Sequence, residues 1–373
     1  MIKRELIFSG LLLFVFSVTL NAQVKTSYSR MDGRMDGNID IIGNFNRVGT
    51  KVEGNYSYNL YVDDSLLHLA PIVQLYGGID KHNKVILKQL QKTDSMLTGL
   101  FADHRFIGSW HGPDSAGIPF RLKEDYPDGS IRMDIFYLHS GKELVTGDKG
   151  TPSAEIELTL LYPKKSIHIS SAVTDSVKKF IQEQFFGQFK PKQIPETLMS
   201  RTEKDFYNQF VELNNHWKTN HKLGFNFEKR EQVSVIFNSY HLLCLQYKKR
   251  GYAGRGNPLE HVSYDLVDLR NGEKLTFDRI FKPGSKITLT ALVNKKIRED
   301  NGLPDNASLK KIGFFTDHIP MSKNLSFSGN GIYVIYNIYD IAPPARGIIK
   351  VFLPFSRIGS YIKPSSILYP LSR

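Results

Sequence analysis

The regular spacing of short β-type runs in the first third of the chain limits its fold more than any other feature. Runs rich in Val, Ile, Leu, Phe and Tyr recur at intervals of roughly 10 to 12 residues, and Gly, Asn, Asp and Pro turn signals separate them. These runs occupy residues 38–43, 51–58, 71–76, 85–90, 96–101, 105–110 and 118–122. We find no helical period between residues 27 and 128. The spacing predicts an all-β antiparallel meander over residues 23–128, rolled into a barrel or a sandwich.

The rest of the chain alternates strand-like and helix-like segments. Val173, Val177, Ile181 and Phe185 form a stripe at helical spacing, and further helices are expected at residues 197–217 and 286–300. The expected strands lie at residues 132–137, 154–162, 232–237, 242–247, 262–268, 332–338 and 348–353. This alternation predicts a mixed α+β domain over residues 129–373, with helices packed on an antiparallel sheet. The turn-rich residues 126–130 are expected to separate two independent folding units.

The first 22 residues are typical of a secretory signal peptide. Lys3 and Arg4 precede an apolar run over residues 6–20, and the small residue Ala22 stands at the expected cleavage point. The apolar run has 15 residues, whereas a membrane-spanning helix needs about 20. No cysteine lies near the cleavage point, so a lipid anchor is not expected, and no later apolar stretch has spanning length. We therefore expect a periplasmic or secreted protein without a transmembrane segment.

Cys244 is the single cysteine of the chain, which excludes an intramolecular disulfide. It lies in a strand-like run at residues 241–247. We expect it to be a small buried hydrophobic residue rather than a catalytic thiol, since no partner base can be located.

Basic residues are concentrated in the C-terminal part. Residues 23–159 contain 15 Lys and Arg against 18 Asp and Glu, a net charge of −3, and residues 160–373 contain 32 against 18, a net charge of +14. For an exported chain, the expected partners of a basic surface are anionic cell-wall glycan, lipid headgroups or acidic envelope proteins rather than nucleic acid. A dispersed, solvated charge is the alternative, and doublets such as Lys164-Lys165 fit it equally well.

The sequence contains none of the common hydrolase or nucleotide-binding motifs. Thr276-Phe277-Asp278 superficially resembles the metal-binding segment of polysaccharide deacetylases, but Arg279 follows it and no His-x-x-x-His lies downstream. We expect a strand end that leads into a short helical turn. The series Asp32, Asp36 and Asp40 lacks the alternation of an EF-hand loop, so we expect a turn-rich N-terminal segment there. No catalytic residue, metal or cofactor is predicted.

From residue 160 onward the chain carries a series of short motifs in a fixed order. They are Leu161-Tyr162-Pro163, Tyr252-Ala253-Gly254, Tyr264-Asp265-Leu266, residues 271–276, Phe281 and residues 341–347. Their order and spacing resemble the RsiV-like extracytoplasmic domain family, over about residues 130–373. That family includes the C-terminal domain of the anti-sigma factor RsiV and the N-terminal region of the peptidoglycan deacetylase PdaC. The resemblance implies recognition at the cell wall and implies no catalysis.

One loop departs from the family pattern. Where the family has a loop of the Gly-Gly-Ala-His type, this chain has residues 254–258 with the sequence Gly-Arg-Gly-Asn-Pro. A function that depends on the histidine is therefore not expected. In RsiV the domain recognises lysozyme. Because the corresponding region here carries a net charge of +14, we do not expect tight binding of a basic lysozyme.

The candidate ligand-binding residues lie in two loops and one strand. Tyr252, Arg255 and Asn257 belong to the first loop, and Tyr339 and Arg346 belong to the second. Tyr and Arg in rigid loops are typical of recognition surfaces; the alternative is that the tyrosines pack under their own loops. Trp110, at a strand end, is expected either to stack on a sugar or to be a half-buried core residue.

These observations lead to one main hypothesis and two alternatives. The main hypothesis is an exported, non-catalytic binding protein of the cell envelope that recognises cell-wall glycan or a wall-directed protein through surface loops. The first alternative is an envelope glycan hydrolase or deacetylase with an unrecognised active site. The second is a purely structural envelope component.

Overall fold

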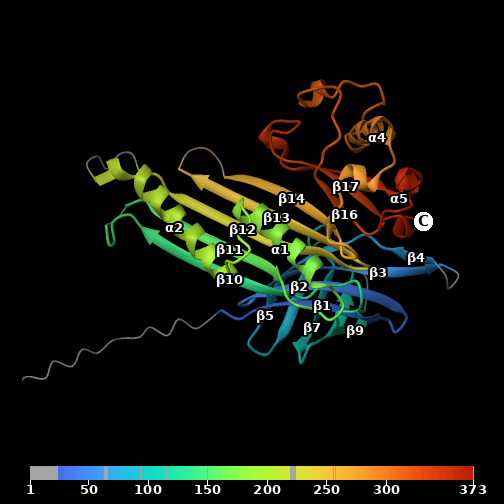
Figure 1. Ribbon diagram of the computed structural model, residues 1–373, viewed down its shortest axis with the longest axis horizontal. Helices are drawn as coiled ribbons and strands as arrows, with labels where there is room; N and C mark the ends of the chain where they lie inside the picture. The colour runs from blue at the N-terminus through green and yellow to red at the C-terminus, as the bar shows by residue number, and fades with distance from the viewer. Residues whose placement is uncertain are drawn as a thin grey trace, which may run out of the picture.

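The computed structural model describes residues 24–62, 66–92, 94–113, 116–148, 150–218, 224–254, 256 and 258–372. The predicted signal peptide therefore lies outside the described residues, as do Arg255 and Asn257. Within the described ranges the strands form a barrel, a six-stranded sheet and a three-stranded sheet (Figure 1). In this part of the chain, no helix combines the length and the apolar character that crossing a membrane requires.

The N-terminal strands, as far as the structure describes them, close an eight-stranded antiparallel barrel. Its strands are β1 (Thr26–Met35), β2 (Ile39–Val48), β3 (Lys51–Val62), β5 (Val73–Ile79), β6 (Lys84–Gln89), β7 (Met96–Ala102), β8 (Arg105–His111) and β9 (Ile118–Glu124). Closure comes from β1, which pairs with both β2 and β9. A short strand, β4 (Leu66–Leu69), pairs with the end of β3. The predicted meander is confirmed, and the barrel is the form it takes.

Side chains fill the inside of the barrel. Inward and outward positions alternate, most clearly along β6, because successive strand residues point to opposite faces. Met31, Phe106 and Phe120 are almost completely buried, and the ring centroids of the two phenylalanines lie 4.8 Å apart. An eight-stranded barrel has an interior of a size that side chains can fill. The barrel is therefore a packed core.

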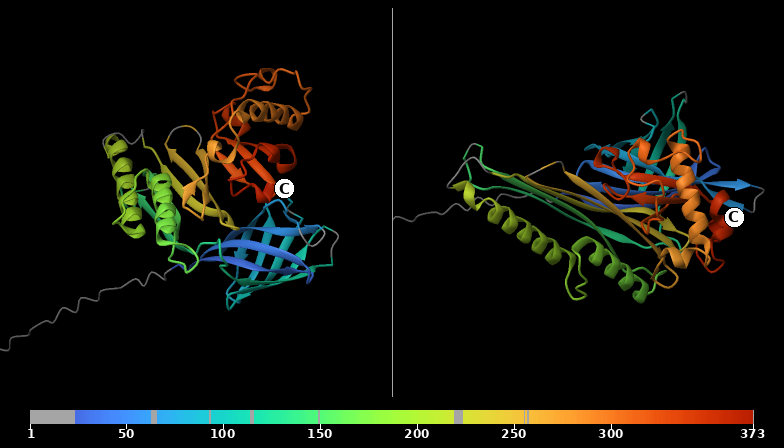
Figure 2. Two further views of the ribbon diagram at one scale, coloured as in Figure 1. Left: turned by 45° about the vertical axis from the view of Figure 1, so that its right-hand side comes forward. Right: turned by 90° about the horizontal axis from the view of Figure 1, so that it is seen from above.

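The large sheet follows in the order β10 (Met133–Glu143), β11 (Ser153–Pro163), β12 (Phe227–Ser239), β13 (Leu242–Ala253), β14 (Leu259–Asp268) and β15 (Glu273–Lys274). The pairs are antiparallel except β11 with β12, which are parallel. The segment between these two strands contains α1 (Ser171–Phe186), α2 (Pro195–Leu213) and the 3-10 turn η1 (Asn215–Lys218). A parallel pair needs such a crossover, and both helices lie along one face of the sheet (Figure 2).

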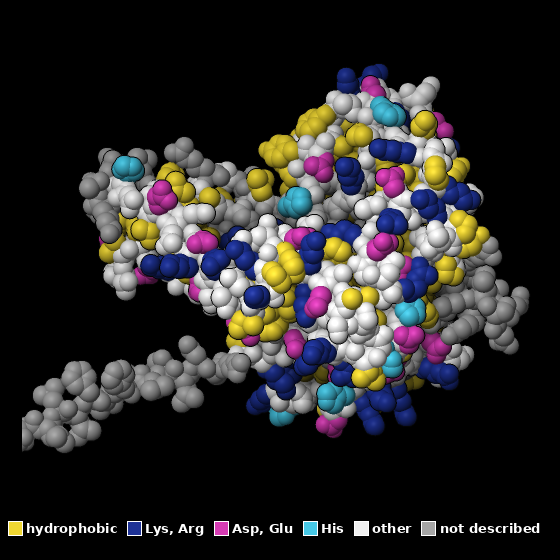
Figure 3. All heavy atoms as spheres, in the orientation of Figure 1, with side chains coloured by type: hydrophobic (Ala, Val, Ile, Leu, Met, Phe, Trp, Pro, Cys, Tyr) yellow, Lys and Arg dark blue, Asp and Glu magenta, His cyan; other side chains and the backbone are white. Residues whose placement is uncertain are grey.

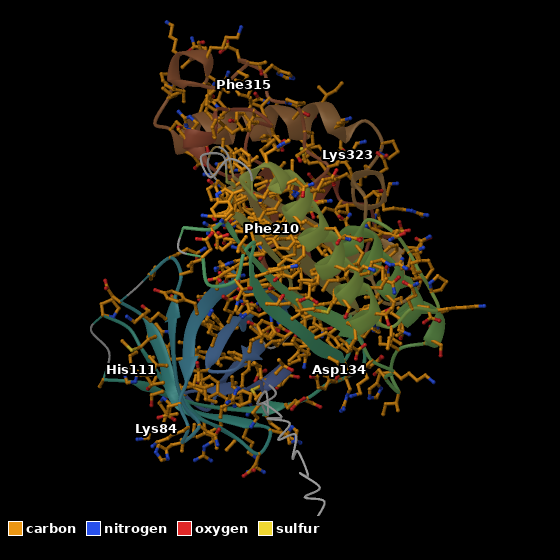
Figure 4. All side chains as sticks on the ribbon, turned by 90° about the vertical axis from the view of Figure 1, so that its left-hand side faces the viewer. Lys84, His111, Asp134, Phe210, Phe315 and Lys323 are labelled. Atoms are coloured by element: carbon orange, nitrogen blue, oxygen red, sulfur yellow. The ribbon has the colours of Figure 1, made fainter. Side chains whose placement is uncertain are left out.

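The two helices begin and end where the sequence provides caps. The Ser170 side chain accepts a hydrogen bond from the Val173 N–H at the start of α1, and Gly187 ends it in the left-handed conformation. Pro195 occupies the first turn of α2, where its missing N–H costs no hydrogen bond. Phe210 of α2 is fully buried and its ring centroid lies 5.5 Å from that of Phe227 (Figure 4). The helices and the sheet thus share one apolar core.

The C-terminal unit, residues 277–372, packs against β12 to β14. Its strands are β16 (Leu325–Phe327), β17 (Gly331–Tyr336) and β18 (Ile349–Pro354), and its α-helices are α3 (Phe277–Ile280), α4 (Ser285–Asp300) and α5 (Phe355–Ile358). Its 3-10 turns are η2 (Lys310–Ile312), η3 (Pro344–Arg346), η4 (Gly359–Tyr361) and η5 (Pro370–Ser372). Leu289, Val293 and Ile297 of α4 are buried in its core. The predicted α+β class is confirmed.

A buried polar network joins the barrel to the large sheet. The Asn238 side-chain amide donates hydrogen bonds to the Tyr28 hydroxyl and to the Ile131 carbonyl, and its side-chain oxygen accepts from the Ile131 N–H. The Tyr28 hydroxyl in turn donates to Asn44, whose amide donates to Asn55. The expected boundary at residues 126–130 corresponds to the tight turn between β9 and β10. Whether the two units fold independently stays a prediction.

Candidate functional site: a cleft between the barrel, the large sheet and the C-terminal unit

Three adjoining cavities lie on the face of the large sheet that the helices leave uncovered. They hold about 230, 210 and 410 Å³. Lys248 lines all three cavities, Gln232 lines the first and second, and Gln246 lines the second and third. The cavities therefore adjoin one another along the same face of the sheet, and together we call them the central cleft. The barrel and the C-terminal unit flank it, near the same end of the large sheet (Figure 2).

The floor of the central cleft is the polar face of β12, β13 and β14. It is formed by Arg230, Gln232, Ser234, Gln246, Lys248, Arg250, Glu260, Val262 and Tyr264. Strand side chains alternate between faces, so Val233 and Val235 of the same strand point to the helices. This alternation lets one strand hold a buried apolar face and a polar cleft floor.

The first wall is the barrel, and a bulge in β12 fixes its position. The register of β12 with β13 shifts between Val235 and Phe237, and the Val235 carbonyl accepts a hydrogen bond from the Asn55 amide of β3 at 2.6 Å. The Gln232 amide also donates to Glu53 of β3, at 2.9 Å. A bulge diverts a strand from regular pairing and is common next to functional sites. The barrel is thus bonded directly to the cleft floor.

The second wall is the small sheet of the C-terminal unit, which two asparagines hold against β14. The Asn324 side chain accepts from the Tyr264 N–H and donates to the Val262 carbonyl. The Asn337 side chain accepts from the Val262 N–H at 2.8 Å and donates to the same carbonyl at 3.1 Å. β15 pairs only with the last two residues of β14. The side-chain amides of Asn324 and Asn337 therefore bond backbone groups of Val262 and Tyr264 that have no partner in β15. They fix the width of the cleft on this side.

Most charged groups of the cleft floor are paired. Arg230 lies 2.9 Å from a Glu228 oxygen and 3.8 Å from a Glu157 oxygen. The Lys248 amine lies 3.3 Å from Glu260. These groups are partly exposed, and such pairs contribute about 0–1 kcal/mol to stability. Their arrangement is therefore available for contacts with a ligand at little cost to the fold.

Lys350 lines the third cavity of the cleft from β18. No hydrogen bond or ion pair joins its amine to any other residue that the structure describes. Although the side chain reaches solvent, the surrounding cleft walls remove much of its hydration, and this lowers its pKa below 10.5. The positive charge of Lys248 lowers the pKa further, and Glu260 opposes the shift. Two lysines and a single carboxylate, that of Glu260, therefore line the third cavity together.

Neutral polar groups line the rest of the cleft. The Gln246 amide donates to the Tyr264 hydroxyl at 2.5 Å. Burial raises the pKa of Tyr264 to about 12, so this hydroxyl stays protonated and can donate a hydrogen bond. Gln74 and Gln91 face the same space from the barrel, and Tyr333 faces it from the C-terminal unit. Amides and hydroxyls with aromatic rings are the groups that bind sugars and extended polar chains.

A separate cavity of about 700 Å³ lies on the helix-bearing side of the large sheet. Tyr252 lines it, together with Phe185, Phe206 and Leu259. Glu231, which also lines it, is buried with its carboxylate 3.0 Å from Lys229 and 3.7 Å from Lys249. Most charges there already have a partner, whereas the Asp205 carboxylate, which also lines this cavity, has no hydrogen bond or ion pair with a residue that the structure describes.

The structure does not bring the candidate loop residues into one site. Tyr252 lines the aromatic cavity, and Arg255 and Asn257 lie outside the described residues. Tyr339 is 58% exposed with a φ of 71°. Arg346 braces its own unit: its guanidinium donates to Asn301 and to a backbone carbonyl, and lies over an aromatic ring.

Trp110, the remaining candidate, is half-buried and packs against the barrel core. It does not line the central cleft. Lys248 and Lys350 were also missed by the sequence analysis. Lys248 lies in a strand whose sequence shows only the ordinary alternation of a β-strand. Their only sequence signal was the excess of positive charge, and Figure 3 shows basic side chains spread among acidic ones on the face in view.

The segment Thr276-Phe277-Asp278, which superficially resembles a deacetylase motif in sequence, has the local structure of a strand end and a helical turn. Thr276 precedes the short helix α3 directly after β15, so Thr276-Phe277-Asp278 forms a strand end that leads into a helical turn, as predicted. Asp278 is exposed and the following Arg279 pairs with Glu273. Among the described residues, no group of three or more His, Cys, Asp and Glu side chains is placed to hold a metal ion.

Comparison with known proteins shows a similarity to one family in the C-terminal unit. Residues 278–356 match the family described as "Protein of unknown function (DUF3298)". A DUF3298 family member from Bacteroides fragilis has a similar fold, with a TM-score of 0.58 and 20% sequence identity over 65% of this chain and 98% of that chain. A DUF3298 family protein from Pseudomonas aeruginosa matches with a TM-score of 0.44 and 15% identity, over 63% and 97% of the two chains. No curated protein matches the chain.

Proposed function

We propose that this chain is an exported, non-catalytic binding protein of the cell envelope, and that its ligand lies in the central cleft. The observation that carries the proposal is the row of three adjoining cavities, all of which Lys248 lines. A groove of this kind suits an extended ligand rather than a compact one. It differs from the mostly apolar pockets that bind small molecules.

The lining of the cleft favours a polar polymer as the ligand. Amides, tyrosines and paired charges of both signs alternate along it. Sugar hydroxyls both donate and accept hydrogen bonds, and side-chain amides do the same. We therefore assign cell-wall glycan as the ligand class, ahead of lipid headgroups and acidic envelope proteins. The resemblance to the RsiV-like family, which is compatible with the similarity of residues 278–356 to the DUF3298 family, supports a role at the cell wall.

Export is part of the same proposal. The signal-peptide pattern at residues 1–22 supports it, and a glycan ligand of the wall would be met only outside the cytoplasm. The basic charge of residues 160–373 disfavours a basic lysozyme as the partner. We accordingly expect no sub-micromolar binding of a basic lysozyme in calorimetry.

Co-sedimentation of the mature protein with purified peptidoglycan sacculi tests the proposal. A tryptophan at Ser234, on the cleft floor, would fill the middle of the groove, so Ser234→Trp should reduce the bound fraction at least about tenfold. Ile86→Trp is the matched control, because Ile86 is 54% exposed on the outside of the barrel. It should leave binding unchanged.

Two results would contradict the proposal. The first is wild-type protein that stays in the supernatant, and the second is Ser234→Trp protein that sediments as well as the control. Both variants should first show the far-ultraviolet circular dichroism of the wild type. Release of reducing ends or acetate from the sacculi would instead favour the alternative of a hydrolase or deacetylase.

A further inference from the structure

We propose that Lys248 and Lys350 form a subsite in the central cleft for a carboxylate carried by the cell-wall glycan. This inference rests on the proposed function and names the chemical group of the ligand that the cleft recognises. It starts from the geometry of the third cavity. This cavity holds about 410 Å³ and is lined by both lysines, by Glu260 and by Tyr264.

The charge balance of this cavity leaves one positive charge without a partner. Lys248 lies 3.3 Å from Glu260, which neutralises one ammonium group. The amine of Lys350 has no hydrogen bond or ion pair with any residue in the described part of the chain. A carboxylate placed between the two amines would accept hydrogen bonds from both. It would also remove the mutual repulsion of the lysines, which now disfavours the protonated form of Lys350.

The neighbouring neutral groups supply the rest of such a subsite. The Gln246 amide donates to the Tyr264 hydroxyl at 2.5 Å, which leaves the proton of that hydroxyl free to bond a ligand oxygen. The aromatic ring of Tyr333 lies in the same cavity and packs on Phe352 with ring centroids 5.1 Å apart. A ring held in this way is a rigid surface for a sugar. The site thus combines an anion-binding pair with groups suited to the adjoining sugar.

The position of the lysines favours a glycan over a membrane. Lys248 lies on the cleft floor and Lys350 on the wall that the C-terminal unit forms, and Ile72, Gln74 and Gln91 line the same cavity from the barrel side. A bilayer surface is too broad to enter such a groove, whereas a single polymer strand can. The ammonium group of a lysine binds anions as a point charge at the end of a flexible side chain. The shape of the cleft restricts which anion can approach it.

Calorimetry with two forms of one soluble peptidoglycan fragment tests the inference. One form has free carboxylates and the other has the same carboxylates converted to amides. The wild type should bind the free form about tenfold more tightly at low salt, because hydrogen bonds to charged groups contribute about 1.5–3 kcal/mol. Lys350→Gln and Lys248→Gln should each remove most of that preference and change the affinity for the amidated form less than about twofold. Lys350→Arg, which keeps the charge, should retain it.

Lys84→Gln is the matched control, since it removes one exposed lysine at the far side of the barrel from the C-terminal unit (Figure 4). It should leave both affinities unchanged. Equal binding of the two forms by the wild type, or an unchanged preference in Lys350→Gln, would overturn the inference while leaving the proposed function intact. Binding of neither form would overturn both. Tight binding of phosphatidylglycerol vesicles that Lys350→Gln abolishes would overturn the glycan assignment.

Discussion

Replacing Arg30 by methionine is the perturbation for which the structure gives the clearest magnitude. Arg30, on β1, is 1% exposed and lies at the junction of the barrel with the large sheet. Its guanidinium donates to the Asn238 carbonyl at 2.6 Å, to the Ser239 hydroxyl at 2.5 Å and to the Asp125 carbonyl at 2.8 Å. It also pairs with the Asp32 carboxylate at 2.5 Å. Arg30→Met keeps the apolar stem and removes these bonds together.

The expected loss of stability follows from the polar groups that Arg30→Met leaves without their partner. Asn238 and Ser239 are almost fully buried, and a buried polar group left without its partner costs about 1–3 kcal/mol. Asp32 would keep a partly buried charge without its counter-ion, and breaking a buried ion pair costs about 3–5 kcal/mol. Water can reach Asp125 and part of Asp32, which reduces the sum. We therefore expect the free energy of unfolding at neutral pH to fall by about 3–5 kcal/mol.

The loss should depend on pH through Asp32. Burial raises the pKa of this carboxyl above 3.8, and the Arg30 charge opposes the increase. Without Arg30 the pKa rises further, so the folded state holds the proton more tightly than the unfolded state does. Stability is then lost as the pH rises through the interval between the two pKa values. The difference between Arg30→Met and the wild type should accordingly be smaller below the unfolded pKa than at neutral pH.

Urea denaturation at several pH values measures these quantities. Arg34→Met is the control, because Arg34 lies on the same strand but its side chain is 66% exposed, 3.1 Å from Asp40. Its effect should stay within about 1 kcal/mol. The reasoning would be refuted if Arg30→Met cost no more than Arg34→Met, or if its cost were the same at acid and neutral pH.

Three further predictions concern single positions. Gly129 has a φ of +77° and a Cβ there would lie 2.6 Å from a backbone nitrogen, so Gly129→Ala should lower stability in urea by more than about 2 kcal/mol. Gly147→Ala, with a φ of +79° in open space, should cost about 1 kcal/mol. Burial raises the pKa of Cys244 to about 12, so a thiol reagent should react with it only at the rate of unfolding, and fast reaction in the native state would contradict this. The pKa of Lys350, followed by nuclear magnetic resonance, should lie below 10.5 and rise in Lys248→Gln; an unchanged value would argue against their interaction.

The sequence predicted the elements well where the buried residues alternate regularly. α1 begins and ends within two residues of the apolar stripe at 173–185. α4 begins and ends within two residues of the predicted helix at 286–300. The strands of the meander follow from the same periodicity. Cys244 is buried, as expected for a small hydrophobic residue. These features depend on local pattern, which a single sequence contains.

The expectation of a turn-rich segment over Asp32, Asp36 and Asp40 was wrong for Asp32 and Asp40, which lie in β1 and β2, whereas Asp36 lies in the turn between these strands. Residues 26–35 form β1, which closes the barrel. The pattern misled because β1 carries the buried polar side chains of Ser29 and Arg30, and Arg30 bonds to the large sheet. A strand that binds its neighbour through polar groups reads as a loop when only apolar alternation is considered.

The central cleft could not be predicted for a different reason. Its lining comes from β2, β3, β5, β11, β12, β13, β14, β16, β17 and β18. Lys248 and Lys350 line one cavity because the C-terminal unit packs on β12 to β14, where Asn324 and Asn337 bond it to β14. No local pattern in the sequence encodes that juxtaposition. Candidates chosen for their loop character, such as Tyr339, fall outside it.

A crystal structure of the mature protein with a carboxylated peptidoglycan fragment tests the central claim most directly. The account predicts that the glycan lies along the polar face of β12 to β14, between the barrel and the C-terminal unit. One of its carboxylates should lie within hydrogen-bond distance of the amines of Lys248 and Lys350. A fragment bound in the aromatic cavity beside Tyr252, or on the loop that carries Tyr339, with an empty central cleft, would contradict the account.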